Sequence, residues 1–202
     1  MVLPEFNAEF LKERLIKLDS KRQIAFGAIC CERLLPNYLA FQKDAGWGDI
    51  NPIRKALDLV WFYLNGETRN IQEIKDLTDS CESVAPSSDD FESLYVTSAQ
   101  DACFAVCCLL DYLLENDVGK IVQVATYATD SVDLYVQEIE NMAPNDPELE
   151  QKILTHQLMQ KELTQQEENL KAIEQASALD SNFLAQLKAS WNNNKKSNLN
   201  LP

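Results

Sequence analysis

The sequence places charged side chains inside or beside segments that are otherwise apolar, and these are its first candidates for chemistry. Glu32 and Arg33 interrupt the apolar segment 24–35. Asp101 directly precedes the apolar segment 102–110. A charge that leaves water needs a partner, because its desolvation is costly. We therefore expect all three side chains to be paired, either with other helices or within one shared site.

Two interpretations of these charges stay open. In the first, Glu32 and Arg33 each pair with another helix or reach the surface. Asp101 then caps its own helix together with Ser98, because the two residues have the spacing of a capping box. In the second, Asp101 is the counter-charge of Arg33, and the three charges line a ligand pocket. Asp130 faces away from the apolar stripe of its helix, so we expect it to be solvated.

Two loops supply the remaining candidate residues. Trp47 and Asp49 lie in the glycine-containing loop 46–49, and Asp89 and Asp90 lie in the loop 87–91. Loops carry binding residues more often than packed helices do. One hypothesis is that both loops meet over the Glu32–Arg33–Asp101 cluster and form a single mouth. The alternative is ordinary turn chemistry, with Asp89 or Ser88 as a helix cap and Trp47 in the core.

The residue types exclude several kinds of catalytic centre. His156 is the single histidine, which excludes a histidine-rich metal site. Cys103 and Cys107 are one helical turn apart, but a closed zinc site needs two further ligands. Gly46 and Gly48 lack the strand and the third glycine of a phosphate-binding loop. The sequence gives no positive support for an enzyme, and we predict neither a metal nor a cofactor.

The charge balance limits the partners. The formal net charge is -14, and no basic stripe runs along any predicted helix. Such a protein repels the phosphates of nucleic acids and of anionic membrane surfaces. We therefore predict no nucleic-acid partner and no membrane partner. A basic protein partner remains compatible with the charge, although acidity alone also serves solubility.

The N-terminus and the cysteines indicate the cytoplasm. The first residues have neither the basic nor the apolar part of a secretory signal. The longest uncharged apolar run, 102–110, is far shorter than the about 20 residues that span a bilayer. Six cysteines lie in this chain, four of them as adjacent pairs in apolar helical segments. Adjacent helical residues point about 100° apart, so we expect buried free thiols rather than disulfides.

Helical periodicity and capping signals predict an all-α fold. Glycine is scarce, and Pro36 is expected to end or kink the second helix. We predict one domain over residues 1–191, a bundle of about seven to nine helices with short connections. Residues 192–202 are polar and are expected to form a disordered tail. The predicted helices cover about 7–18, 20–35, 51–64, 70–84, 98–114, 117–142, 147–177 and 180–191.

The predicted helix 147–177 suggests a dimer. About 30 residues make a rod of roughly 45 Å, whereas a compact domain of this length is only about 43 Å across. The rod must cross the whole body or project from it. We therefore predict a homodimer that uses this helix, with coverage of its own bundle as the alternative. The helix offers an imperfect apolar stripe of Leu149, Ile153, Leu158, Met159, Leu163, Leu170 and Ile173.

Several motifs resemble the YjaG-like bacterial family, a domain of unknown function. The resemblance lies in Cys31-Glu32-Arg33-Leu34-Leu35-Pro36-Asn37-Tyr38, Phe41, Gly46-Trp47-Gly48-Asp49, Pro86-Ser87-Ser88-Asp89-Asp90-Phe91 and Ala99-Gln100-Asp101-Ala102-Cys103. It spans most of the chain through about Met142. It implies a helical, cytoplasmic protein and brings no established activity, so no catalytic residue is carried over.

These observations favour a non-catalytic cytoplasmic helical interaction protein that self-associates. A small-ligand binder or enzyme that uses the Glu32–Arg33–Asp101 cluster is the first alternative. An acidic neutraliser of a basic protein partner is the second, and it rests on net charge alone.

Overall fold

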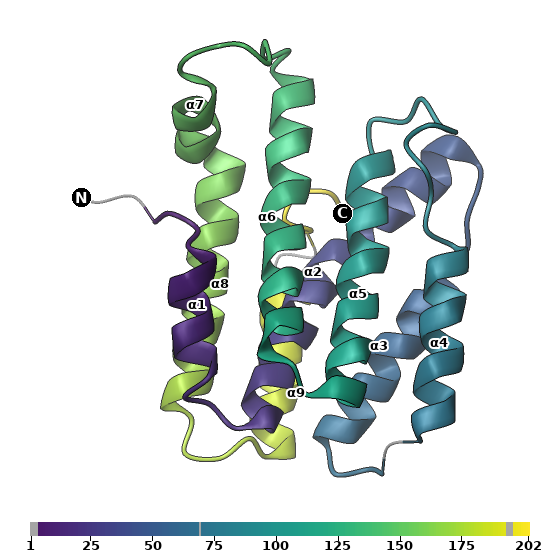
Figure 1. The fold of residues 1–202 in the computed structure, drawn as a ribbon, viewed down its shortest axis with the longest axis vertical. Helices are drawn as coiled ribbons and strands as arrows, with labels where there is room; N and C mark the ends of the chain where they lie inside the picture. The colour runs from purple at the N-terminus through teal and green to yellow at the C-terminus, as the bar shows by residue number, and fades with distance from the viewer. Residues whose placement is uncertain (1–3, 69, 193–195) are drawn as a thin grey trace.

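The computed structural model describes residues 4–68, 70–192 and 196–202, and this part of the chain contains helices and connecting loops but no strand. The described helices are nine, and 72% of the residues are helical, which confirms the predicted all-α class. Figure 1 shows them packed side by side in one bundle. Their bounds are α1 (Ala8–Leu15), α2 (Ser20–Ala45), α3 (Asn51–Leu64), α4 (Ile71–Ser83), α5 (Val96–Glu115), α6 (Val118–Ile139), α7 (Leu149–Thr155), α8 (Gln157–Gln175) and α9 (Ser181–Asn192).

Helices α2 and α5 form the centre of the bundle. Helix α2 packs against α3, α5, α6, α8 and α9, and α5 packs against α6 and α4. A Cβ atom on Gly27 would lie 2.9 Å from Leu109 Cδ1 and 3.1 Å from Ile121 Cδ1, so this glycine lets α2 approach both neighbours closely. Among the described residues, α2 and α5 are long and apolar enough to cross a membrane, yet 89% and 72% of those windows are buried inside the fold. All six cysteines are free and buried, as predicted.

From the sequence, Pro36 is expected to end or kink the second helix, and the first of these outcomes, an end near Leu35, is wrong. Helix α2 continues through Pro36 to Ala45 and ends at Gly46, whose φ of 63° is left-handed. Proline inside a helix removes one hydrogen bond and costs about 3 kcal/mol. Tyr38 and Phe41 are fully buried beyond the proline, and their burial offsets that cost.

The predicted rod 147–177 is also wrong. The helix is interrupted at His156, where the backbone is extended with a ψ of 141°, and this interruption separates α7 from α8. The His156 Nδ1 atom accepts a hydrogen bond of 3.2 Å from the Leu158 amide, so the histidine caps α8. Helix α8 packs against α6 and α2. It therefore covers its own bundle, which is the alternative to projection into a dimer.

The predicted disordered tail does not hold for residues 196–202; positions 193–195 lie outside the described residues. Ser197, Asn198 and Leu199 are buried. The Asn198 Nδ2 atom donates hydrogen bonds of 2.8 Å to the Ala128 carbonyl and to Ser131 Oγ, and its Oδ1 accepts one from Asn37. A polar segment is ordered here because its side chains satisfy buried groups of α2 and α6.

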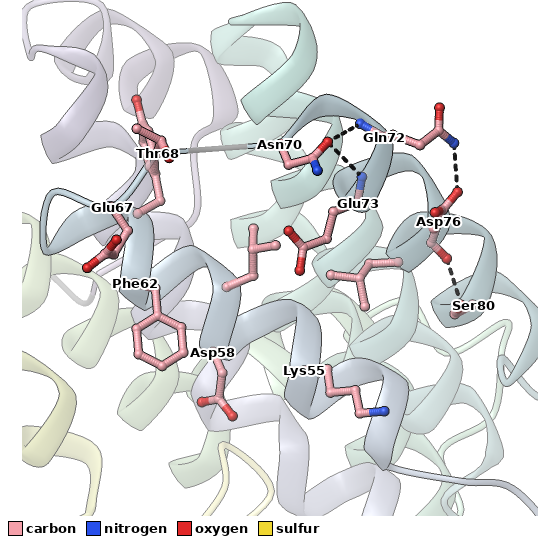
Figure 2. A pocket seen from close by; sticks show the side chains of 13 residues that line it. Lys55, Asp58, Phe62, Glu67, Thr68, Asn70, Gln72, Glu73, Asp76 and Ser80 are labelled. Atoms are coloured by element: carbon pink, nitrogen blue, oxygen red, sulfur yellow. Dashed lines mark hydrogen bonds between the residues drawn. The ribbon is translucent and has the colours of Figure 1, made fainter.

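Helices α3 and α4 lie at one edge of the bundle and border an open groove of about 890 Å³ (Figures 1 and 2). Asn70 begins α4 as predicted, since its Oδ1 accepts hydrogen bonds from the Gln72 and Glu73 amides at 2.9 and 3.4 Å. This groove, which we call the α3–α4 groove, was not foreseen from the sequence. It is lined by Lys55, Asp58, Leu59, Phe62, Tyr63, Glu67, Thr68, Asn70, Gln72, Glu73, Asp76, Leu77 and Ser80.

Candidate functional site

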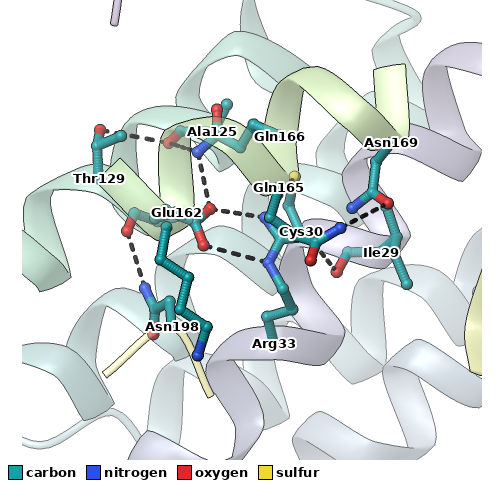
Figure 3. Close-up of polar contacts among 12 residues, drawn as sticks. Ile29, Cys30, Arg33, Ala125, Thr129, Glu162, Gln165, Gln166, Asn169 and Asn198 are labelled. Atoms are coloured by element: carbon teal, nitrogen blue, oxygen red, sulfur yellow. Dashed lines mark hydrogen bonds and ion pairs between the residues drawn. The ribbon is translucent and has the colours of Figure 1, made fainter. Parts of the chain in front are cut away.

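Arg33 forms an enclosed ion pair with Glu162 of α8 (Figure 3). Its Nη2 and Nε atoms lie 2.6 and 3.2 Å from the two carboxylate oxygens, and the side chains are only 5% and 1% exposed. The guanidinium also donates to the Ile29 carbonyl at 3.2 Å, and Gln166 Nε2 donates to Glu162 at 2.9 Å. Burial opposes the charged guanidinium, but the facing carboxylate of Glu162 raises the pKa of Arg33. The pair is buried and bidentate, which suits a structural role.

Glu32 points in a different direction and meets α3 and α9. Its carboxylate accepts hydrogen bonds of 2.7 and 2.8 Å from Arg54 and one of 2.7 Å from Trp61 Nε1. Lys188 of α9 lies 3.5 Å from the same carboxylate, and its ammonium stands 5.2 Å from the centre of the Trp61 ring. Asp58 closes the cluster, 2.9 Å from Arg54 and 3.6 Å from Lys188. This cluster is half open, because Lys188 is 35% exposed.

Asp101 is not the counter-charge of Arg33, so the second interpretation of the charges is wrong. It lies near Asp130 of α6, and its buried Oδ2 atom has no hydrogen-bond partner. Burial and, secondarily, the charge of Asp130 raise the pKa of Asp101 to about 7. Asp130 itself is exposed, as predicted.

The capping role of Asp101 is wrong as well. Helix α5 begins at Val96, and no side chain caps its first turn. Ser98 therefore lies inside the helix, where its hydroxyl donates to the Tyr95 carbonyl at 3.0 Å. Burial of Val96 and Ala99 extends the helix beyond the point where the capping signal placed its start.

The two candidate loops meet, but over an aromatic cluster. The Trp47 and Phe91 rings lie 5.1 Å apart, and Phe41 contacts both at 6.1 and 5.2 Å. Phe41 lies nine residues beyond Glu32 on the same helix, about 14 Å along its axis. The Glu32, Arg33 and Asp101 side chains have separate partners, so the mouth over a shared charged cluster is wrong.

The two loops show turn chemistry. Asp49 Oδ1 accepts hydrogen bonds from the backbone and side-chain nitrogens of Asn51 at 3.0 and 2.7 Å. The amides of Asp89 and Asp90 donate to Ser87 at 3.3 and 3.1 Å. Tyr38 holds the first loop, because its hydroxyl accepts from the Asp49 amide and donates to the Val84 carbonyl. This part of the structure has the geometry of two packed turns.

Sequence reasoning missed the carboxylates of the α3–α4 groove. Asp58, Glu67, Glu73 and Asp76 line it, and Lys55 is the one basic residue among its described lining residues. The ion pairs between described residues leave Glu67, Glu73 and Asp76 without a cation. No residue pattern in the sequence marks this groove. The structure marks it by the ring of Phe62, which is 64% exposed although large apolar side chains of a helix normally turn inward.

A second surface is nearly free of carboxylates. Leu39, Tyr95 and Leu201 line a hollow of about 490 Å³, and Tyr135 stacks on Tyr95 with ring centres 6.2 Å apart. Leu94 is exposed beside Tyr95, and Leu39 is 46% exposed. These five residues, which we call the apolar patch, join α2, the start of α5, α6 and the C-terminal segment. Lys43 and Asp44 stand at its border.

Together these features define a single-domain all-α bundle with paired buried charges and two open surfaces. Residues 10–201 match the family described as "Protein of unknown function (DUF416)". The chain therefore belongs to this family, which confirms the resemblance seen in its sequence motifs.

The sequence relatives bring no activity, and a solved structure of the same family shares the fold. "Uncharacterized protein YjaG" of Escherichia coli K12 is 39% identical over 97 residues, 46% of this chain and 47% of the relative. The protein of the same description from Salmonella typhimurium LT2 is 35% identical over 108 residues, 52% and 53% of the two chains. This chain thus spans about half the length of the curated relatives it matches. The crystal structure of a DUF416 family protein from Shewanella baltica OS155 superposes with a TM-score of 0.85 at 26% identity, over 94% of this chain and 97% of that one.

Proposed function

We propose that this chain is a non-catalytic helical interaction protein of the cytoplasm that self-associates. The observation that carries this proposal is the pairing of the buried charges. Arg33 is hydrogen-bonded to Glu162, and Glu32 accepts hydrogen bonds from Arg54 and Trp61. A Glu–Arg–Asp ligand pocket would need these groups to converge on open space, whereas each is directed to a different helix.

The apolar patch is the surface best suited to self-association. A chain with a net charge of -14 opposes contact with its own copy wherever carboxylates gather. The described lining of this hollow has one acidic side chain, Asp44, which accepts a hydrogen bond of 2.7 Å from Ser93 and stands beside Lys43. In a twofold contact the same surface meets itself, so Lys43 of each copy can face Asp44 of the other.

The dimer interface predicted from the sequence, on the helix 147–177, is not favoured. Apart from Ala172, the exposed side chains of α8 are polar, among them Thr164, Glu168 and Lys171. Its apolar residues, Met159, Leu163, Leu170 and Ile173, are buried within the bundle. A dimer interface formed by α8 would therefore bury polar side chains and would lack the apolar core that stable interfaces have.

Light scattering at tens of micromolar tests self-association. We expect a mass of about twice 22.9 kDa for the wild type. The double variant Leu39→Arg/Leu94→Arg should give a monomer, because it places two cations in the apolar patch. Ile16→Arg is the matched control, since Ile16 is an exposed apolar residue of the N-terminal region, outside the patch. A monomeric wild type would refute self-association, and equal disruption by Ile16→Arg would refute this location.

A small-ligand binder remains the alternative, supported by the half-open cluster around Glu32. A groove of about 260 Å³ between α3 and α9 reaches Trp61 and Lys188. Arg54 belongs to the same charged cluster, and its buried Nε atom has no hydrogen-bond partner among the described residues. A ligand retained in this groove in a crystal structure would favour the alternative.

A further inference from the structure

We propose that the α3–α4 groove is a docking site for a basic amphipathic helix of a partner protein. The inference rests on the proposed role as an interaction protein and adds a second surface, separate from the apolar patch, with a partner of different chemistry.

The floor and rims of the groove are suited to apolar anchors. Leu59, Tyr63 and Leu77 are partly buried and rest on the core, so they form a firm floor. Phe62 stands at one rim and is 64% exposed (Figure 2). An aromatic residue left in water at the edge of a concave surface is typical of a protein-binding site, because its burial supplies much of the binding energy.

The charges around this floor select a cationic partner. Glu67, Glu73 and Asp76 are exposed, and Asp58 adds a fourth carboxylate. Asp58 already contacts Arg54 and Lys188, but the described ion pairs contain no cation for the other three. Lysine or arginine side chains of a partner would neutralise them, whereas a second copy of this acidic chain would be repelled.

The shape favours a peptide segment over a metal ion or a small molecule. Among the described residues, no three acidic, cysteine or histidine side chains are placed to hold a metal ion. Helices α3 and α4 have 14 and 13 residues, so the groove is bordered by walls of about 20 Å. Small-molecule sites enclose most of their ligand, while an amphipathic helix binds in an open groove between two helices.

Fluorescence anisotropy with a synthetic probe tests the proposal. The probe is a fluorescein-labelled helical peptide with leucines on one face and lysines on the flanks, titrated at about 0.15 M salt. We expect saturable binding by the wild type and about tenfold weaker binding by the variant Glu67→Gln/Glu73→Gln/Asp76→Asn. Phe62→Ala should weaken binding by about five- to tenfold.

A charge-matched control separates docking from general attraction to an acidic protein. Glu9→Gln/Glu13→Gln/Glu168→Gln removes the same number of exposed carboxylates from α1 and α8. We expect its affinity to stay within about twofold of the wild type. Equal weakening by both triple variants, or no saturable binding by the wild type, would overturn the proposal.

The experiment also separates this inference from self-association. Leu39→Arg/Leu94→Arg should bind the probe as the wild type does, because the apolar patch and the groove share no residues. A wild-type dimer that does not bind the probe would refute the groove alone. A monomer that binds it through Glu67, Glu73 and Asp76 would refute self-association alone.

Discussion

The charges of α2 and those of the α3–α4 groove have opposite surroundings. Arg33 is enclosed and has both carboxylate oxygens of Glu162 within hydrogen-bond distance. Glu67 and Glu73 face water, and neither takes part in an ion pair between described residues. A buried charge without its partner would destabilise the fold, while an exposed carboxylate costs little when unpaired. The first kind of charge therefore fixes helices, and the second kind is free to bind a partner.

The neighbouring residues Glu32 and Arg33 show how one helix organises its surroundings. They point about 100° apart, as adjacent helical residues do. Glu32 connects α2 with α3 and α9, and Arg33 connects it with α8. The C-terminal helices are thus tied to α2 by ion pairs as well as by apolar packing.

Removing Arg33 should produce the largest effect on stability. Arg33→Ala leaves the Glu162 carboxylate buried with no cation, so we expect a loss of about 3–5 kcal/mol in the free energy of unfolding. Urea denaturation followed by circular dichroism measures it. The double variant Arg33→Met/Glu162→Met should recover most of the loss, because it removes both charges. A loss below about 1 kcal/mol for Arg33→Ala would contradict a structural role for the pair.

Asp101 should give a smaller effect that depends on pH. Its pKa is raised to about 7 in the folded protein, against about 3.9 in an unfolded chain. The folded state keeps the proton where the unfolded state has lost it, so stability falls as pH rises from about 4 to about 7. Asp101→Asn removes this pH-dependent loss of stability. The free energy of unfolding of the variant, relative to that of the wild type, should therefore rise by about 1–2 kcal/mol between about pH 5.5 and about pH 8.

Urea denaturation of Asp101→Asn and the wild type at the two pH values measures this difference. Asp130→Asn serves as the comparison, since it removes the second carboxylate and should reduce the pH dependence only in part. If the difference in free energy of unfolding between Asp101→Asn and the wild type were the same at both pH values, the Asp101 carboxyl would not titrate as described.

Lys188 should have the smallest effect. Its ammonium contacts Glu32 and Asp58 but is partly exposed, and Arg54 already satisfies Glu32. Lys188→Ala should therefore cost less than about 1 kcal/mol. Thermal unfolding at low and high salt measures the change, which should shrink as salt screens the pair. A loss as large as that of Arg33→Ala would show that the half-open cluster is as essential as the enclosed pair.

Helix periodicity and capping residues were enough to predict the all-α fold and most helix positions. Local signals failed where distant packing decided the outcome. Pro36 predicts a helix end, yet the fully buried Tyr38 and Phe41 keep α2 continuous. The composition of 196–202 predicts disorder, yet Asn198 finds partners on α2 and α6. Neither effect can be read from neighbouring residues in the chain.

The sequence also showed that Glu32 and Arg33 would be paired, but it could not name their partners. Glu162 lies 129 residues from Arg33, in a segment that reads as a polar helix. The α3–α4 groove was missed for a related reason. Its carboxylates are ordinary solvated residues in the sequence, and only the placement of α3 beside α4 brings them into the lining of one groove with Phe62.

The most direct test measures stability and binding on the same variant, Glu67→Gln/Glu73→Gln/Asp76→Asn. If exposed groove charges bind a partner and buried charges hold the fold, its free energy of unfolding should stay within about 0.5 kcal/mol of the wild type. Its affinity for the leucine–lysine peptide should fall about tenfold. A marked loss of stability with unchanged peptide affinity would contradict the account, because the groove carboxylates would then be structural.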